Sequence, residues 1–598
     1  MLQINKEQQD AITFRDGTLL LIAGPGSGKT FVLTNRIKAL IDSGIDSSHI
    51  LVITFTKAAA SEMQSRFERL MTKENAVSFG TFHSIFYSIL KHHKKYSNVV
   101  PITDKEKLNI IKRTFEIVNL PDAKENLDEL LSTLGLISAC KNNGNQPNAF
   151  TQNKYDSATF TSIFNTYNDL LLEFNKIDFD DMINLCLGLL ANEPGYLKRW
   201  QDKYSYILID EFQDISSNQY ELVKLLASPE NNIFAVGDDD QSIYRFRGAR
   251  VEIMHRLQED FKDSETKYLS VNYRCESEIV TVANQVISEN TLRFAKNIMA
   301  NKSGGCSVVD IKGFSSPIKQ NEYIIKLLQG CSNEELNGYA ILTRNNRYGS
   351  KYAALLRSNN ILVDYKEKTI PFSASYIKDI CAYIEYAEGN HSREVFLRIM
   401  NKPLRYIKRD YIPSFVNEQK LIDAYESDSF MQKRIKLMFE QLARIHNMSI
   451  FLAINYIRKV IGYDEYMKSG LSAELYKRYT EEIEEFTSIC RECKSYLEIQ
   501  EKLKMIQSSE AESSLSKGVH IYTYHSSKGL EFSRVILPDV NDGIIPTKSA
   551  HTNEDIEEER RMLYVAMTRA QDNLHILYRT DENNKPSRFI GKILNDKT

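Results

Sequence analysis

Residues 19–30 read LLLIAGPGSGKT, and this stretch decides the fold. The apolar residues predict a buried strand, the glycines predict a tight loop, and a helical pattern begins after it. In that order, glycines let backbone N–H groups turn toward phosphate oxygens, and a lysine ending the loop reaches the outer phosphates of a nucleotide. We interpret the stretch as a phosphate-binding loop. Its predicted nucleotide-binding residues are Ala23, Gly24, Pro25, Gly26, Ser27, Gly28, Lys29 and Thr30.

Other apolar segments also end in polar clusters. The first set continues with Ile50–Thr54, Tyr206–Ile209 and Ile233–Val236. Strands with polar carboxyl ends are typical of a parallel sheet whose ligand crevice lies at those ends. A second set predicts a second sheet and comprises Tyr268–Val271, Val308–Ile311, Ala340–Thr343, His520–Thr523, Val535–Leu537 and Leu574–Tyr578. The predicted fold class is therefore α/β, with two parallel-sheet lobes.

Each lobe carries a mainly helical insertion. In the second insertion, five apolar residues keep helical spacing: Ile435, Leu437, Met438, Leu442 and Ile445. We predict six segments along the chain. They are 1–84, the first lobe with its phosphate loop; 85–197, its helical insertion; 198–270, the rest of the first lobe; 271–370, the start of the second lobe; 371–514, its helical insertion; and 515–598, the rest of the second lobe.

The composition is that of a soluble globular protein. Of the 598 residues, 42% are hydrophobic and 26% charged, which excludes a mainly disordered, collagenous or disulfide-stapled chain. No apolar run approaches the ~20 residues that span a bilayer, and the N-terminus lacks a signal-peptide core, so we expect a cytoplasmic protein. Cys490 and Cys493 have CxxC spacing without a second pair, and we interpret them as helix residues rather than a zinc site.

Two adjacent carboxylates, Asp210 and Glu211, end the strand of the third polar cluster. One carboxylate can hold Mg²⁺ and the other can orient and deprotonate an attacking water. Without other signals, such a pair is usually a solvated strand end. We assign it a catalytic role because a phosphate loop lies upstream in the same chain. Thr30 and Asp210 are the predicted metal ligands, and the predicted metal is Mg²⁺.

Nine sequence motifs together indicate a resemblance to a known family. In chain order they read QQDA, AGPGSGKT, TFTKAAASEM, GTFHS, IDEFQD, GDDDQSIYRFRGA, NYR, TYHSSKGLEF and EEERRMLYVAMTRA. The chain resembles the UvrD/Rep/PcrA group of superfamily 1 helicases over almost its whole length. The resemblance implies two RecA-like lobes with ATP bound in the cleft between them.

The resemblance also implies roles for single residues. Gln8 would read the adenine edge, Tyr273 would stack on the base and Glu531 would bind the ribose. Gln241 would sense the γ-phosphate. The implied catalytic set is Lys29, Asp210, Glu211, Gln241, Arg274 and Arg569. Its two arginines would reach across the cleft from the second lobe. This arrangement suits phosphoryl transfer because positive charge near the equatorial oxygens of the transferred phosphoryl group stabilises their negative charge.

The implied partners are single-stranded DNA and 3′-tailed duplex DNA. The family's DNA track maps onto Phe55, Lys57, Thr81, His83, Tyr244, Phe246 and His525. Aromatic rings there would stack on bases in a sequence-tolerant way. Two positions depart from the family: Phe246 stands where Trp is usual, and Lys57 stands where an Asn usually meets DNA.

A larger departure follows Tyr578, where residues 579–585 read RTDENNK. In well-known members this region is longer and forms a hairpin that wedges the duplex, so the departure bears on strand separation more than on translocation. The leading hypothesis is an ATP-dependent DNA translocase and helicase, with the 3′ to 5′ polarity that the resemblance implies. One alternative is a motor subunit of a nuclease–helicase complex in repair or anti-phage defence, which would work with a nuclease or loading protein. The others are a nucleotide-gated DNA-binding module and an RNA motor.

Overall fold

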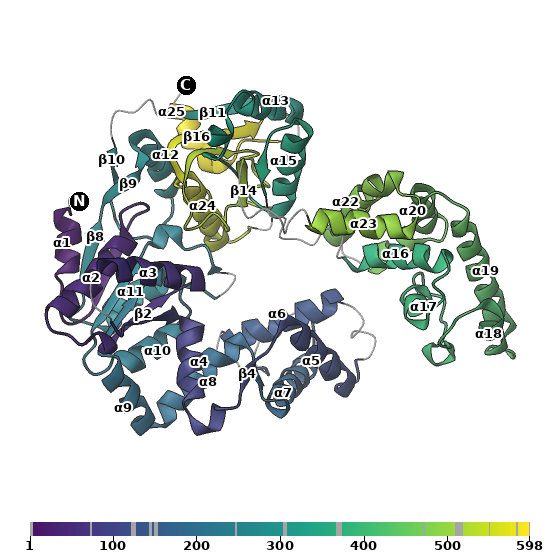
Figure 1. Ribbon diagram of the computed structural model, residues 1–598, viewed down its shortest axis with the longest axis horizontal. Helices are drawn as coiled ribbons and strands as arrows, with labels where there is room; N and C mark the ends of the chain where they lie inside the picture. The colour runs from purple at the N-terminus through teal and green to yellow at the C-terminus, as the bar shows by residue number, and fades with distance from the viewer. Residues whose placement is uncertain are drawn as a thin grey trace. The chain divides into compact units, whose positions relative to one another are not determined.

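The structure is a computed structural model, and it divides the chain into two compact units, Met1–Tyr365 with Lys517–Thr598, and Lys366–Ser516 (Figure 1). The described residues are 4–71, 75–120, 127–142, 146–148, 154–245, 248–302, 308–365, 374–470, 473–508, 518–548, 550–581 and 584–596. Among them, no helix is both long enough and apolar enough to cross a membrane.

The first sheet has six parallel strands in the order β3-β2-β6-β7-β1-β8. Alternate residues of β1 enter different cores: Leu19 and Leu21 pack with α2 and α3, whereas Leu20 and Ile22 join the core on the opposite face. Both faces are therefore covered, as a parallel sheet requires. The elements are β1 (Leu19–Ala23), β2 (Ile50–Thr54), β3 (Ser78–Thr81), β6 (Tyr206–Ile209), β7 (Ile233–Gly237), β8 (Glu265–Leu269), α1 (Lys6–Ile12), α2 (Lys29–Asp42), α3 (Lys57–Leu70), α10 (Ser217–Ala227) and α11 (Glu252–Asp260).

The second sheet also has six parallel strands, in the order β11-β16-β15-β12-β14-β13. Its ribbons are teal and yellow in Figure 1 because its strands come from both sides of the second insertion. The elements are β11 (Val308–Phe314), β12 (Tyr339–Thr343), β13 (Val363–Asp364), β14 (Val519–Thr523), β15 (Phe532–Leu537), β16 (Ala570–Arg579), α12 (Ser277–Ile287), α13 (Pro317–Leu328), α14 (Asn333–Leu336), α15 (Asn346–Ser358), α24 (Asn553–Met567) and α25 (Gly591–Asp596). The prediction of two α/β lobes is confirmed.

One predicted strand is wrong. The sequence places Tyr268–Val271 in the second sheet, but β8 ends at Leu269 and pairs with β1 in the first sheet. Ser270 separates the two strands, and its N–H and hydroxyl both donate hydrogen bonds to Glu7 on α1. A separate strand then begins: β9 (Val271–Glu276) pairs with β10 (Met299–Lys302).

In the segment between β3 and β6, the described residues form helices and one two-stranded pair. Its helices divide between two cores: α5, α6 and α7 form one of their own, while α4, α8 and α9 pack onto the first sheet. The elements are α4 (Phe82–Lys91), β4 (Val100–Pro101), α5 (Asp104–Ile117), α6 (Leu127–Asn142), α7 (Ser157–Glu173), β5 (Lys176–Ile177), α8 (Phe179–Asn192) and α9 (Pro194–Lys203). The domain boundaries given by the sequence stay predictions.

The described residues of the second unit form helices around one apolar core, drawn in green in Figure 1. The expected helical pattern lies on α19, where four of its five residues are buried and Leu437 is 54% exposed. Cys490 and Cys493 are buried in this core, at a short 3-10 turn rather than within a helix. The helices are α16 (Ser375–Ala387), α17 (Arg393–Ile399), α18 (Glu418–Asp423), α19 (Ser429–His446), α20 (Ile450–Lys459), α21 (Tyr463–Gly470), α22 (Ala473–Ile489) and α23 (Tyr496–Ser508).

Candidate active site

The phosphate loop connects β1 to α2 and packs against Arg274 and Ile298. Gly26 and Gly28 have φ of 66° and 86°, the left-handed region that glycine adopts without strain. A Cβ on Gly26 would lie 2.7 Å from Arg274 Cβ, and one on Gly24 would lie 2.5 Å from Ile298 Cδ1. A side chain at Gly26 would therefore collide with Arg274, and one at Gly24 would displace the end of the Ile298 side chain. The N-terminus of α2 follows, where free N–H groups favour an anion.

The predicted carboxylate pair lies at the end of β6. Glu211 has φ of 53°, a strained conformation for a residue other than glycine. Lys29 Nζ lies 3.7 Å from Glu211 Oε1, and Gln213 donates to the same carboxylate. Burial and the adjacent Glu211 charge raise the pKa of Asp210 to about 7. Burial would also raise the pKa of Glu211, but the Lys29 and Lys528 charges outweigh it and lower that pKa to about 2.

Mg²⁺ fits this end of the sheet. Asp210 is only 6% exposed, and burial together with the Glu211 charge disfavours its ionised form more than the Lys29 and Lys528 charges favour it, so a bound cation would stabilise the carboxylate. Carboxylate and hydroxyl oxygens are the donors that Mg²⁺ prefers. Asp210 and the Thr30 hydroxyl, one residue after the phosphate-loop lysine, are thus a suitable donor pair.

The end of the site that contains Gln241 joins the two lobes. Gln241 follows β7 in the first lobe, and its Oε1 accepts from Arg569 Nη2 at 3.3 Å. Arg569 follows α24 in the second lobe and is 2% exposed. Its other donors bind the carbonyl oxygens of Val565 and Leu530, so its side chain is fixed. Burial, followed by the Arg274 charge, lowers the pKa of Arg569 to about 9.

Arg274 lies beside the phosphate loop on β9. Its Nε is 2.8 Å from Glu531 Oε2, and its Nη1 donates to the Thr568 carbonyl at 3.4 Å. The predicted finger and the predicted ribose ligand are therefore paired with each other. The ribose contact of Glu531 stays a prediction.

The two predicted adenine contacts both lie at the phosphate loop. Gln8 Nε2 donates to the Ser27 carbonyl at 3.1 Å, and Tyr273 N donates to the Gly26 carbonyl at 2.9 Å. Asn5 caps α1 and donates to the Tyr273 hydroxyl at 2.8 Å. The structure thus brings Gln8 and Tyr273 together, although 265 residues separate them in sequence.

Lys528 is a site residue that sequence reasoning missed. It belongs to TYHSSKGLEF in the second lobe, yet its ammonium group contacts Asp214, lies 3.7 Å from Glu211 Oε2 and donates to the Gln241 carbonyl at 2.8 Å. The same group lies 5.0 Å from the ring centroid of Tyr244. A lysine inside a recognised motif was the available signal, but only the fold reveals which acids it meets.

The predicted DNA residues form two groups. Phe55 stacks on Tyr244 with ring centroids 4.9 Å apart, and Tyr244 lies 6.3 Å from His525 of the second lobe. Exposed Lys57 begins α3, two residues after Phe55. Phe246 lies outside the described residues.

The second group lies at the start of α4. Thr81 caps this helix, and the His83 ring meets Phe179 edge-on at 5.4 Å. Burial lowers the pKa of His83, which favours a neutral ring. Phe179, which sequence reasoning missed, begins α8 and is 58% exposed, so an aromatic face is available beside the predicted contacts.

Comparisons with known proteins agree with this architecture. Residues 4–262 match the family described as the UvrD/REP helicase N-terminal domain, and residues 267–581 match the UvrD-like helicase C-terminal domain. The chain is 30% identical to the ATP-dependent DNA helicase PcrA of Staphylococcus epidermidis, over 99% of this chain and 86% of that protein. It is 31% identical to the ATP-dependent DNA helicase Rep of Buchnera aphidicola subsp. Baizongia pistaciae, over 98% and 94% of the two chains. It is 29% identical to the putative ATP-dependent DNA helicase YjcD of Bacillus subtilis, over 99% and 81%.

Proposed function

Because the chain belongs to the UvrD/Rep family of ATP-dependent DNA helicases, we propose that it uses ATP hydrolysis to move 3′ to 5′ along single-stranded DNA. The observation that carries this proposal is the contact between Arg569 Nη2 of the second lobe and Gln241 Oε1 of the first. A cation supplied by one lobe to the phosphate site of the other makes hydrolysis depend on lobe closure.

Each residue of the cleft then has a chemical task. Backbone N–H groups of the phosphate loop and Lys29 bind the phosphates. Glu211 accepts a proton from the water that attacks the γ-phosphorus, and Gln241 orients the transferred group. Arg274 and Arg569 stabilise the negative charge that develops on the phosphoryl oxygens. Asp210 and Thr30 would hold Mg²⁺, which neutralises phosphate charge when bound.

The DNA track is proposed along Phe55, Tyr244 and His525, with Thr81, His83 and Phe179 beyond. Stacked rings suit a motor because every base has a π-face, so grip does not depend on sequence. Lys528 supports coupling of the track to hydrolysis, since it contacts both the Tyr244 ring and Asp214. A shift of Tyr244 on DNA binding would change the charge environment of Glu211.

The proposal is tested with purified protein and two oligonucleotide substrates. We expect single-stranded DNA to stimulate ATP turnover, and a streptavidin block to be displaced from the 5′ end but not from the 3′ end. Lys29→Ala serves as the inactive control. Turnover that DNA does not stimulate would contradict the motor, whereas displacement from the 3′ end would contradict only the direction.

A second candidate is a motor subunit that needs a nuclease or loading partner to open duplex DNA. It is favoured by the connection after β16, which ends at Arg579 and is closed by the bridge between Asn541 and Pro586. Residues 582 and 583 of this connection lie outside the description. Strong stimulation by single-stranded DNA without unwinding of a 3′-tailed duplex would support the subunit. Robust unwinding by the chain alone would favour a self-sufficient helicase.

A further inference from the structure

Residues 290–299, which follow α12 and end at the first residue of β10, contact both lobes, and we name this segment the strap. On the second-lobe side, Glu557 of α24 accepts from the backbone N–H and hydroxyl of Thr291, both at 2.7 Å. Arg561 of the same helix donates to the Leu292 carbonyl at 2.9 Å. The strap is therefore tied to the helix that precedes Arg569.

On the first-lobe side, the strap enters a group of three acids that precede Gln241. The Lys296 ammonium group contacts Asp238 and lies 2.5 Å from Asp239 and 2.9 Å from Asp240. The Lys296 side chain is 1% exposed, and those of the three acids are 0% exposed. Arg293 adds a two-pronged contact to Asp240, at 3.1 and 2.7 Å. The three carboxylates thus surround a lysine, which occupies the position that a metal ion would take.

Lys296 keeps Asp238 ionised. Burial opposes ionisation of this carboxyl, but the charges of Lys296 and Lys29 outweigh it and lower its pKa. Burial likewise opposes the charge on Lys296, and the three carboxylates outweigh it and raise the lysine's pKa. Since each charge depends on the other, removing Lys296 would leave buried carboxylates without their main partner.

Asp238 in turn fixes the orientation of the Gln241 amide. Asp238 Oδ2 accepts from Gln241 Nε2 at 2.6 Å, which leaves Gln241 Oε1 to accept from Arg569. A protonated Asp238 could donate instead, and the amide could then turn its N–H₂ group toward the guanidinium, where two donors would oppose each other. Asp238 also receives support from the other side, because Gln213 Oε1 accepts from its backbone N–H.

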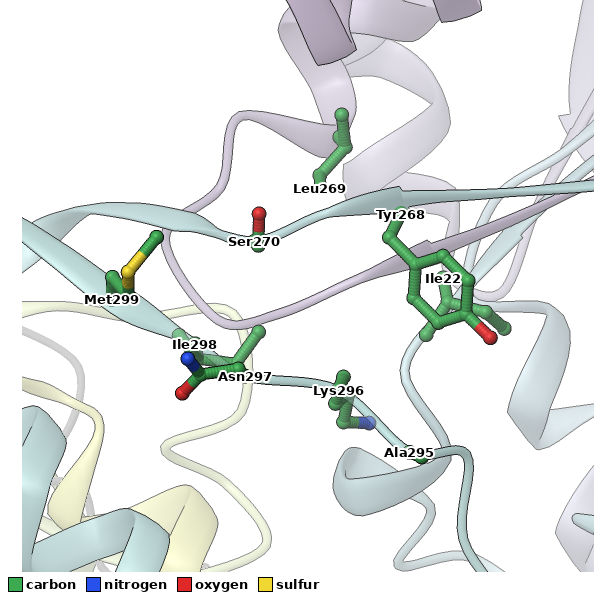
Figure 2. Close-up of a pocket in the computed structure, with 9 residues that line it drawn as sticks. All are labelled: Ile22, Tyr268, Leu269, Ser270, Ala295, Lys296, Asn297, Ile298 and Met299. Carbon is green, nitrogen blue, oxygen red and sulfur yellow. The ribbon is translucent and has the colours of Figure 1, made fainter.

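The strap ends behind the phosphate loop. Ile298 is the residue that a Cβ on Gly24 would meet, and Met299 N donates to the Ser270 carbonyl at 2.8 Å. Between the strap and β8 lies a cavity of about 220 Å³, lined on one side by residues 295–299 and on the other by residues 268–270 with Ile22 (Figure 2). The strap thus reaches both the phosphate loop and the acids that lead to Gln241.

We propose that Lys296 is a positioning residue for ATP hydrolysis, which acts by holding Asp238 as the acceptor that points Gln241 Oε1 at Arg569. This inference rests on the proposed function, because it assigns Lys296 to the same phosphate site. It predicts a defect in the chemical step rather than in binding of either substrate.

The test compares Lys296→Met, Lys296→Arg and Gln241→Ala, singly and combined, in DNA-stimulated ATP turnover. Lys296→Met should lower kcat about tenfold or more, with KM for ATP and DNA affinity within about threefold of the parent. Lys296→Arg should restore part of the loss because it keeps the charge. In the Lys296→Met background, Gln241→Ala should lower kcat less than about twofold further, since both changes break one chain of contacts. Lys302→Met, at a half-exposed lysine on β10, is the matched control and should behave as the parent.

Two outcomes would overturn the proposal: a Lys296→Met kcat within about threefold of the parent, or effects of Lys296→Met and Gln241→Ala that multiply. If Lys296→Met does not fold, as judged by its thermal transition, Asp238→Asn replaces it, and multiplying effects would overturn the proposal in the same way. A parent protein whose turnover is not stimulated by DNA would instead overturn the proposed function, and the inference with it. The two failures are therefore distinguishable.

Discussion

The two sheets share a design and differ in what stands at their edges. Each has six parallel strands, and each is covered on both faces by helices. The first ends β1 in a glycine loop and β6 in a carboxylate pair, whereas the second lobe supplies Arg274, Lys528 and Arg569. The comparison teaches that the sheet is a scaffold: the strand ends of the first sheet carry the predicted phosphate and metal contacts, and the second lobe carries the three cations that face them.

The largest expected effect comes from removing the phosphate contact of the first lobe. Lys29→Ala should lower ATP turnover by about 10³-fold, because the lysine stabilises charge that grows in the transition state. Binding of labelled single-stranded DNA should stay close to that of the parent. Lys38→Ala, on the exposed side of α2, is the control for loss of a lysine from the same helix. Equal losses in the two variants would show that the effect is not specific to Lys29, and would contradict its role as a phosphate contact.

A smaller effect is expected from the base. Glu211→Gln keeps the size of the side chain but cannot accept the proton of the attacking water, so turnover should fall by about 10²-fold or more. ATP and DNA binding, measured by equilibrium titration, should persist, and the variant should stall on DNA. Hydrolysis at the parent rate would show that Glu211 is not the base. Glu221→Gln on α10 tests whether any nearby glutamate has this effect.

Lys528→Met sharpens the comparison because this residue belongs to the second lobe and contacts the acids of the first. We expect the ratio of DNA-stimulated to basal turnover to fall about tenfold, with a smaller change in the basal rate. The reason is that Lys528 joins the Tyr244 ring to Asp214. An unchanged ratio in steady-state assays would mean that the DNA track communicates with Glu211 by another route.

The smallest effect is expected from a single ring of the track. Phe55→Ala should raise the DNA concentration for half-maximal stimulation about fivefold, which corresponds to the ~1 kcal/mol lower limit for stacking on one base. The maximal rate should stay close to that of the parent. Phe55→Tyr should retain the stacking, and Phe430→Ala, in the second unit, controls for loss of an exposed ring elsewhere. If Phe55→Tyr raises the DNA concentration for half-maximal stimulation as much as Phe55→Ala does, stacking is not the interaction lost.

Much of this fold could be predicted because strand ends and loop glycines are local signals. The α/β class and the family followed from motifs whose order is visible in the chain. The break at Ser270 could not be predicted, since it depends on Glu7, which lies 263 residues away. Helical periodicity also did not identify Leu437 as the exposed member of its pattern, because the exposed side of α19 depends on tertiary packing.

Part of the candidate site could be predicted from sequence motifs, and part could not. Gln241, Arg274 and Arg569 stand in recognisable motifs, and the structure brings Gln241 and Arg569 into contact. Lys296 lies in no motif quoted above, and its importance arises only from the three acids that surround it. Phe179 precedes two aspartates, and nothing in the local sequence predicts that its ring lies beside His83. Charges and rings that act through distant partners need the tertiary structure to be identified.

The central claim is that the second lobe completes the hydrolytic site of the first, and Arg569→Ala tests it most directly. The measurement is ATP turnover with and without saturating single-stranded DNA, beside equilibrium binding of both ligands. The account predicts that the variant binds ATP and DNA as the parent does, while its DNA-stimulated turnover falls by about 10²-fold or more. A variant that keeps the stimulated rate would contradict the account, because the first lobe would then hydrolyse ATP without the charge from the second.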